Sequence, residues 1–244
     1  MLKFVAKFIS LQYELINLDK FGMAKIFLTA KDSVNIAADL YEVQQPLGWL
    51  VLIHMMPATK DSWQNLAEQF QNEGYESMAI DLRGHGSSDD GPEGYINFTD
   101  EDHQKSIFDL EAAVEYLIRN RKASPEKISF IGASIGANLA LQYISEHQEY
   151  KSAVLFSAGL NYHGIAAEPL IKNLKAGQKV FFISSRDDLR SSGNNAEQNK
   201  QLYDLAPTGA QKKIKIYETG GHGTDILKNN PELASLIKDF IKES

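Results

Sequence analysis

Ser134 lies at the centre of Gly132-Ala-Ser-Ile-Gly136, a segment with the spacing G-x-S-x-G. A serine in a sharp turn from strand to helix can present its hydroxyl as a nucleophile. Glycines two residues away have no Cβ that would collide across such a turn. The first N–H groups of the helix, at the positive end of its dipole, suit a developing oxyanion. The pattern also arises by chance, so the neighbouring elements decide whether it carries chemistry.

The elements on both sides of Ser134 are those that such a turn requires. Residues 128–131 form a short apolar run of β-favouring residues, which predicts a buried strand that ends at Gly132. Residues 139–144 repeat apolar side chains at three- and four-residue spacing, which predicts a helix. Ser134 is therefore predicted to be a nucleophile, and the alternative is an ordinary helix N-cap.

A serine nucleophile needs a base, and His222 is the predicted one. It lies in a glycine-rich stretch, 220–223, directly after the predicted strand 213–218, so it leaves the sheet at a carboxyl end. Ligands bind at the carboxyl ends of parallel strands, where this histidine would meet Ser134. The other histidines are less suitable. His85 lies in a glycine turn, His103 and His147 lie on or near helix surfaces, and His163 lies in a loop. His54 lies where an oxyanion loop is expected.

A carboxylate that orients the histidine is expected at the exit of another strand. The predicted strand 179–184 runs into a loop that contains Asp187 and Asp188, and either could reach His222 from there. The chain order is then serine, aspartate, histidine. The spacing alone leaves both aspartates open.

Composition bounds the fold and the partners. The chain has 244 residues, 43% of them hydrophobic, which suits one large α/β domain with a sizeable core. A formal charge of −7 without a basic block argues against nucleic acid as a partner. The absence of cysteine excludes disulfides and thiolate chemistry. No apolar run reaches the length of a transmembrane segment.

The first 22 residues are predicted to form an amphipathic extension that docks on the body. Charged residues interrupt their apolar stripe, and no cleavage site for a signal peptide is clear. A cytoplasmic protein is the expectation; the alternatives are export through a degenerate signal and a start at Met23. The apolar residues at helical spacing are Leu2, Phe4, Val5, Phe8, Ile9, Leu11, Leu15 and Ile16.

From residue 23 to 244 the chain predicts a single domain. An antiparallel hairpin, 24–29 with 34–43, precedes a regular alternation of strands and helices, so the sheet is mostly parallel and doubly wound. Asp61 or Ser62 is the predicted cap of the first helix. The further predicted strands are 48–54, 77–82, 128–131, 153–158, 179–184 and 213–218, and the helices are 61–73, 102–121, 195–206 and 224–242, with one more that begins directly after Ser134.

Several motifs together resemble the α/β-hydrolases of the serine esterase and lipase kind, compact bacterial carboxylesterases most closely. Residues 81–87 (Asp-Leu-Arg-Gly-His-Gly-Ser) resemble the turn after the fourth strand of that family. Residues 132–136 match its nucleophile elbow, 221–223 resemble its histidine loop, and 157–164 resemble the segment after its sixth strand. The resemblance implies an α/β-hydrolase fold of about eight strands, flanked by helices, from about residue 24 to the C-terminus.

The resemblance also implies roles for particular residues. Ser185 stands at the glycine position of the family's Gly-x-x-Asp stretch, so Asp188 is the preferred acid and Asp187 the reserve. The oxyanion hole would use the backbone N–H groups of Met56 and Ile135. One departure is a methionine, Met55, where relatives usually have glycine, and a side chain at this position can shift the loop. The alternative for the two methionines is flexible core filler.

The predicted activity is hydrolysis of short-chain carboxylic esters of small molecules, without a metal or another cofactor. About twenty residues separate the strands 153–158 and 179–184, too few for a large cap, so the cap is small or absent and the site is shallow. A peptidase, a thioesterase and a non-catalytic interaction protein on the same fold remain alternatives. The predicted pocket walls are Met55, Met56, Trp63, Tyr95, Phe98 and Tyr162.

Two clusters of polar residues receive structural interpretations. Arg83 and His85 are expected to brace a turn. The acidic residues near positions 89–93 and 100–102 lack the spacing of a calcium loop, so a solvated acidic loop is the expectation.

Overall fold

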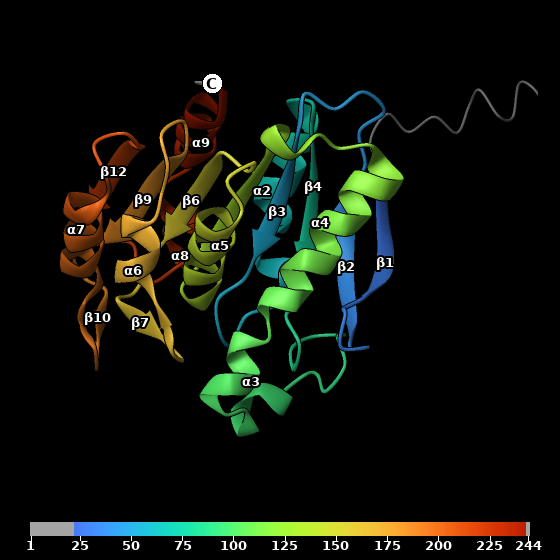
Figure 1. Ribbon diagram of the computed structural model, residues 1–244, viewed down its shortest axis with the longest axis horizontal. Helices are drawn as coiled ribbons and strands as arrows, with labels where there is room; N and C mark the ends of the chain where they lie inside the picture. Colours follow the sequence, from blue (N-terminus) through green and yellow to red (C-terminus); the bar gives the residue numbers. More distant parts are fainter. Residues whose placement is uncertain (1–21, 243–244) are drawn as a thin grey trace, which may run out of the picture.

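The computed structural model describes residues 22–242, which fold around one eight-stranded sheet (Figure 1). The strand order is β1-β2-β4-β3-β5-β6-β9-β12; β2 pairs antiparallel with β1 and β4, and the other pairs are parallel. The mostly parallel sheet and its initial hairpin confirm the predicted fold. The strands are β1 (Met23–Thr29), β2 (Asn35–Tyr41), β3 (Gly48–Ile53), β4 (Tyr75–Ile80), β5 (Ile128–Ala133), β6 (Ser152–Phe156), β9 (Lys179–Ser185) and β12 (Gln211–Tyr217).

Helices cover both faces of the sheet because its central strands are apolar on both sides. One face packs against α4 (Ile107–Arg121), α5 (Ile135–Glu146), α6 (Ala167–Lys172) and α7 (Asn195–Leu205), which lie in front in Figure 1. The other face packs against α2 (Gln64–Asn72), α8 (Asp225–Asn229) and α9 (Leu233–Lys242). Each of the strands β3, β5, β6 and β9 is buried along its whole length.

Some predicted helices are broken. The first begins as a 3-10 turn, η1 (Lys60–Trp63), whose N-cap is Thr59, so the cap predicted at Asp61 or Ser62 is wrong. The helix predicted over 102–121 is two helices, α3 (Asp100–Gln104) and α4, and the capping box at the start of α3 uses Thr99. The last helix is split into α8 and α9 around Pro231, whose ring nitrogen has no hydrogen to donate.

The segment between β6 and β9 holds a hairpin, β7 (Asn161–Tyr162) with β8 (Ile165–Ala166), and α6. A second hairpin, β10 (Leu189–Arg190) with β11 (Gly193–Asn194), follows β9. Both lie at the carboxyl ends of the parallel strands, below the sheet in Figure 1. The segments after β6 and β9 therefore contain these short hairpins and α6, and no large cap.

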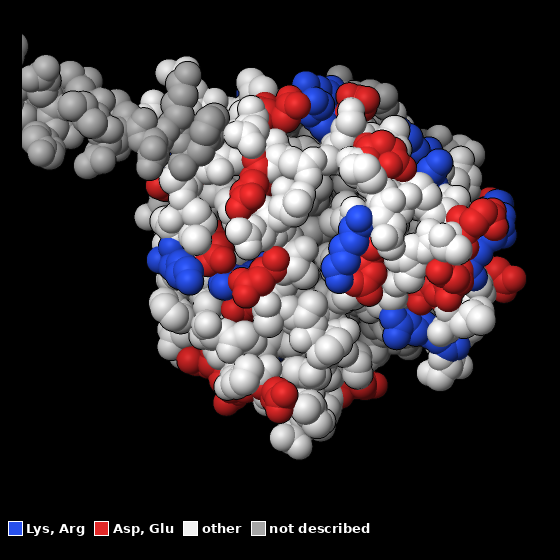
Figure 2. Space-filling view, turned by 180° about the vertical axis from the view of Figure 1, so that it is seen from behind, with Lys and Arg blue, Asp and Glu red and all other residues white. Residues whose placement is uncertain are grey.

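The first 21 residues, on which the predicted N-terminal helix falls, lie outside the described part of the chain. Within residues 22–242, no helix combines the length and the apolar character needed to cross a bilayer. Figure 2 shows the face opposite that of Figure 1, where basic and acidic side chains are interspersed.

Candidate active site

Ser134 occupies the sharp turn between β5 and α5. Its backbone has φ 55° and ψ −120°, a strained conformation for a residue with a side chain. A Cβ at Gly132 would lie 2.0 Å from the carbonyl oxygen of Gly136, and one at Gly136 would lie 2.4 Å from that of Ile53. The turn therefore requires both glycines, as the sequence pattern predicts. The N–H of Ser134 donates to the carbonyl of Phe156 at 2.8 Å, which ties the turn to β6.

Asp188 and His222 meet over the carboxyl ends of β9 and β12. His222 Nδ1 lies 2.6 Å from Asp188 Oδ2, and the two residues are only 8% and 3% exposed. Burial opposes ionisation of Asp188, but hydrogen bonds from His222 and its neighbours outweigh it and hold the pKa of Asp188 below its ordinary value. The ionised carboxylate therefore fixes the proton of His222 on Nδ1 and leaves Nε2 free to accept one.

Asp187 has a different set of partners. Its carboxylate accepts hydrogen bonds from the backbone N–H groups of Gly220 and Gly221, at 3.1 to 3.2 Å. The two neighbouring aspartates therefore have different roles. Asp187 binds the backbone just before His222, and Asp188 binds the imidazole ring of His222.

The histidine loop packs directly against the nucleophile turn. A Cβ at Gly223 would lie 3.3 Å from Cβ of Ala133 and 2.5 Å from Sδ of Met55. The turn at Ser134, the loop of His222 and the loop that carries Met55 therefore lie close together. Burial raises the pKa of Tyr162, and the nearby side chain of Ser134 opposes this rise.

Ser157 joins these parts, although the sequence analysis gave it no role. It follows β6, is fully buried and has φ 51°. Its Oγ accepts the N–H of Gly223 at 2.9 Å, and its side chain helps to hold the pKa of Asp188 below the ordinary value. The sequence signal that could have identified Ser157 is its position: it is a polar residue at the carboxyl end of β6, the strand next to β5.

The loop after β3 is organised by His54. This histidine is fully buried; its Nδ1 donates to the Met55 carbonyl at 2.9 Å and its Nε2 accepts the Leu82 N–H at 3.0 Å. Burial, together with the nearby His85, lowers the pKa of His54 to about 3. The neutral ring therefore bridges the loop to the end of β4 in one tautomer.

This burial predicts that the protein loses stability in acid. The unfolded chain protonates His54 below pH 6.5, whereas the folded chain does so only near pH 3. Because the unfolded state binds more protons in that window, the free energy of unfolding should fall by about 1.4 kcal/mol per pH unit for this group as pH decreases. Burial also lowers the pKa of His103, to about 4, which adds to the effect. Urea unfolding between pH 7 and pH 4 measures the slope.

The variant His54→Gln should flatten this pH dependence, whatever it does to stability at pH 7. His147→Gln is the matched control, because it removes a histidine whose side chain is 38% exposed. An equal slope in wild type and His54→Gln would contradict the assignment.

The predicted pocket residues fall into different places. Trp63 is fully buried with its ring edge-on to Phe156 in the core, so its prediction as a pocket wall is wrong: that side of η1 faces the sheet. Tyr95 is half-buried and stacks on His85 at 4.1 Å. Phe98 is half-buried and contacts the ring of His103. Tyr162 is half-buried, and its phenol donates to the carbonyl of Ser157 at 3.3 Å.

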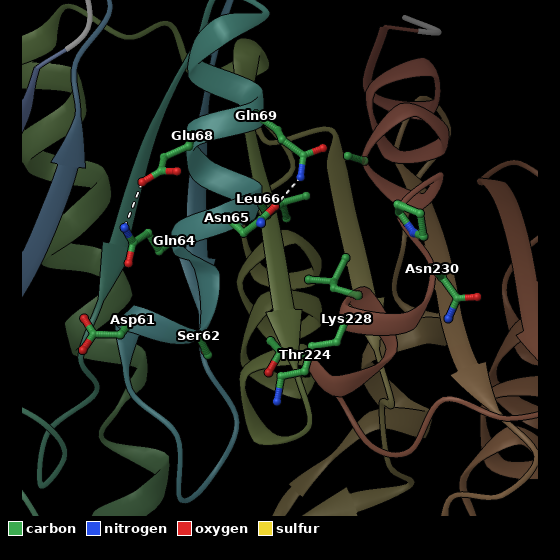
Figure 3. Close-up of a pocket in the computed structure, with 13 residues that line it drawn as sticks. Asp61, Ser62, Gln64, Asn65, Leu66, Glu68, Gln69, Thr224, Lys228 and Asn230 are labelled. Atoms are coloured by element: carbon green, nitrogen blue, oxygen red, sulfur yellow. Dashed lines mark hydrogen bonds between the residues drawn. The ribbon is translucent and has the colours of Figure 1, made fainter.

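A cavity of about 640 Å³ opens between α2 and the α8–α9 segment (Figure 3). Thr224, two residues after His222, lines it, but Ser134, Asp188 and His222 do not. Its polar lining includes Asn65, Gln69 and Asn230. The cavity therefore lies beside the histidine loop and does not contain the candidate nucleophile.

No metal arrangement is present in the described chain: residues 22–242 contain no group of three or more His, Asp or Glu side chains placed to hold an ion. The acidic residues after β4 have local partners instead. Asp89 accepts from Asn35, and Asp102 closes the capping box of Thr99 and pairs with Lys105.

Ion pairs of Arg83 stabilise the turn after β4. Arg83 forms paired hydrogen bonds with Asp109, which is fully buried, and with Asp32. His85 is buried beside it and contacts the ring of His54. The expectation that these two residues brace a turn agrees with these contacts.

Residues 44–186 match the sequence model of a family described as serine aminopeptidase, S33. A search of curated protein sequences finds no significant match. Among solved structures, an esterase from Pyrococcus furiosus superposes with a TM-score of 0.73 at 20% identity, covering 91% of this chain and 90% of that one.

A dienelactone hydrolase from Anabaena variabilis gives 0.70 at 16% identity, covering 90% and 96%. An esterase from Exiguobacterium antarcticum gives 0.69 at 15% identity, covering 90% and 100%. At these identities the likeness establishes a common fold.

Proposed function

Because the chain belongs to the serine aminopeptidase S33 family of α/β-hydrolases, we propose that it is a serine hydrolase that cleaves carboxylic esters, built as one domain over residues 23–244. The family and the fold support hydrolysis of esters or related bonds. The observation that carries the proposal is the buried hydrogen bond between Asp188 and His222 beside the strained turn at Ser134.

In the proposed reaction, His222 Nε2 takes the proton of the Ser134 hydroxyl as Oγ bonds to the ester carbonyl carbon. The same proton then passes to the leaving alcohol as the C–O bond breaks, which leaves an acyl-enzyme. Asp188 holds the ring and stabilises its transient positive charge. Water, deprotonated by His222, attacks the acyl carbon, and Oγ leaves with that proton.

The backbone N–H groups of Met56 and Ile135 are the proposed oxyanion donors. Ile135 begins α5 directly after the nucleophile. The carbonyls of Ile53 and His54 lie against Gly136, so the loop that leads to Met56 runs alongside the first turn of this helix. This contact supports a hole formed between the loop and the helix.

The proposed substrates have short acyl chains. Among the described residues, the segment between β6 and β9 contains only the β7–β8 hairpin and α6, and Ser134 does not line the cavity of about 640 Å³. Long acyl chains need an extended apolar channel, for which these elements provide little surface.

A substrate panel tests the proposal. We expect kcat/KM for p-nitrophenyl butyrate to exceed that for the dodecanoate by about tenfold or more, since a shallow site gains little from added methylenes. An aminoacyl p-nitroanilide and a butyryl thioester complete the panel, because the family description favours a peptidase as the second candidate. If kcat/KM were highest for the anilide or for the dodecanoate, the proposal of a short-chain esterase would be overturned.

A further inference from the structure

The buried carboxylate of Asp188 has a second charged partner, Arg190. Whereas Asp188 Oδ2 lies 2.6 Å from His222 Nδ1, Asp188 Oδ1 accepts a hydrogen bond from Nε of Arg190 at 3.0 Å. The side chain of Asp188 is 2% exposed and that of Arg190 is 46% exposed, so the arginine approaches the acid from the solvent side. Each oxygen of the proposed triad acid is therefore bonded to a different side chain, one neutral or positive and one always positive.

The β10–β11 hairpin places Arg190 beside the acid. Arg190 lies two residues after Asp188, and side chains two residues apart in an extended chain point to the same side. The N–H of Asn195, at the start of α7, donates to the carbonyl of Asp188 at 3.0 Å and closes the base of the hairpin. Gly193, opposite Arg190 on β11, has φ 114°, a backbone angle that favours glycine. The backbone thus holds the arginine against the carboxylate.

Other charged and titratable groups near this pair come from three segments. Burial raises the pKa of Tyr162, on β7; the charge of Asp188 adds to this rise and the charge of Arg190 opposes it. Asp187 is bonded to the backbone just before the histidine. Asp225, at the start of α8, forms an ion pair within that helix. Acidic groups therefore surround the histidine loop, and Arg190 brings a positive charge to the one that bonds the imidazole.

We propose that Arg190 is a positioning residue for the triad, which fixes the carboxylate of Asp188 and offsets part of its negative charge. An aspartate paired with a guanidinium stabilises a proton on its neighbouring imidazole less strongly, because the two charges act on the ring with opposite sign. His222 therefore stays unprotonated, and able to act as a base, at a lower pH than an unpaired aspartate would allow. The inference rests on the proposed function, because it requires His222 to be the base for Ser134.

The exposure of Arg190 limits the size of this effect and provides a way to measure it. Arg190 is among the groups that lower the pKa of Asp188, after His222 and Ser157. Its own side chain is partly in solvent, where water and salt screen its charge. Added salt should therefore weaken the influence of Arg190 on the histidine while the buried bond between Asp188 and His222 persists.

The variant Arg190→Gln tests the role, because it removes the charge and keeps a hydrogen-bond donor. We expect the acid limb of kcat/KM for p-nitrophenyl acetate, measured from pH 5 to pH 8, to move to higher pH by about 0.5 to 1 unit, less than a direct buried contact would give. At a pH below both midpoints this is a loss of about threefold to tenfold. Product is followed at a wavelength where p-nitrophenol and its anion absorb equally.

Two variants serve as controls. Arg190→Lys keeps the charge, so its acid limb should stay close to that of the wild type. Arg186→Gln removes an arginine from the same loop whose partner is the exposed Glu218, at 3.0 Å, so it should leave the acid limb unchanged. Thermal unfolding at pH 5 and pH 8 shows whether each variant is folded. In the wild type, 1 M NaCl should move the acid limb towards that of Arg190→Gln, and the variant itself should respond less.

Each outcome decides for or against the inference. An acid limb of Arg190→Gln at or below the wild-type position would overturn it, and so would an Arg190→Lys limb shifted as far as that of Arg190→Gln, since charge would then not be the cause. If Arg190→Gln failed to fold, a wild-type acid limb that did not respond to salt would overturn it instead. A folded wild-type protein that neither labels with a fluorophosphonate nor hydrolyses any ester would overturn the proposed function and this inference together.

Discussion

Ser134→Ala should abolish labelling by a fluorophosphonate and lower kcat/KM for p-nitrophenyl butyrate by about 10⁴ to 10⁶, as loss of the nucleophile does in serine hydrolases. The substitution removes only the hydroxyl and keeps the Cβ at this turn, so the fold should persist. Intact-mass spectrometry detects the adduct, and steady-state kinetics measures the residual rate.

Ser145→Ala provides the control for this experiment. Ser145 lies on the same helix, α5, and its buried hydroxyl has no hydrogen-bond partner among residues 22–242, so its removal should leave labelling and activity intact. More than a few per cent of wild-type activity in purified Ser134→Ala would place the nucleophile elsewhere. No adduct on well-folded wild type would favour an interaction protein on the same fold.

Asp188→Asn should reduce kcat/KM by about 10³ to 10⁴, the size of loss known when the triad aspartate becomes an amide. An asparagine nitrogen facing His222 Nδ1 can only donate, so it favours the tautomer whose Nε2 carries hydrogen and cannot accept the serine proton. The shape of the side chain is otherwise kept. Steady-state kinetics at several pH values measures the effect.

Asp187→Asn is the matched neighbour. Its Oδ1 can still accept the N–H groups of Gly220 and Gly221, so we expect a loss of about tenfold or less. The sequence left both aspartates open, and this pair of variants separates them. A larger loss at Asp187 than at Asp188 would reverse the assignment.

Most of the proposed site follows from chain-local rules. Ser134 was predicted from the strand, turn and helix around it, and His222 from the strand it follows. The strand exit before Asp187 and Asp188 left both open, and only the resemblance to α/β-hydrolases favoured Asp188. Those rules work because parallel strands bring their carboxyl ends to one edge. The structure places Asp188 and His222 in contact and their loop beside Ser134.

What the sequence could not provide depends on the order of strands in the sheet. Ser157 meets Gly223, 66 residues away, because β6 lies next to both β5 and β9. The same reason explains why the hydrogen bonds of Asn138 to Gly159 and of Asn199 to Ala158, just after β6, were missed. Trp63 was misplaced because a large aromatic side chain after a strand can equally face the core or the site. Pro231, in contrast, was a visible signal for the break between α8 and α9.

The contact of Gly136 with the carbonyls of Ile53 and His54 divides the site into two mechanical units. Ser134 and the loop after β3 belong to one, because their backbones touch. Asp188 and His222 belong to the other, carried by β9 and β12. Only β6 separates the two in the sheet, and all five of its residues are buried. The twist between β5 and β9 therefore sets the distance from nucleophile to base, so repacking the core beneath β6 would alter catalytic alignment without touching a catalytic residue.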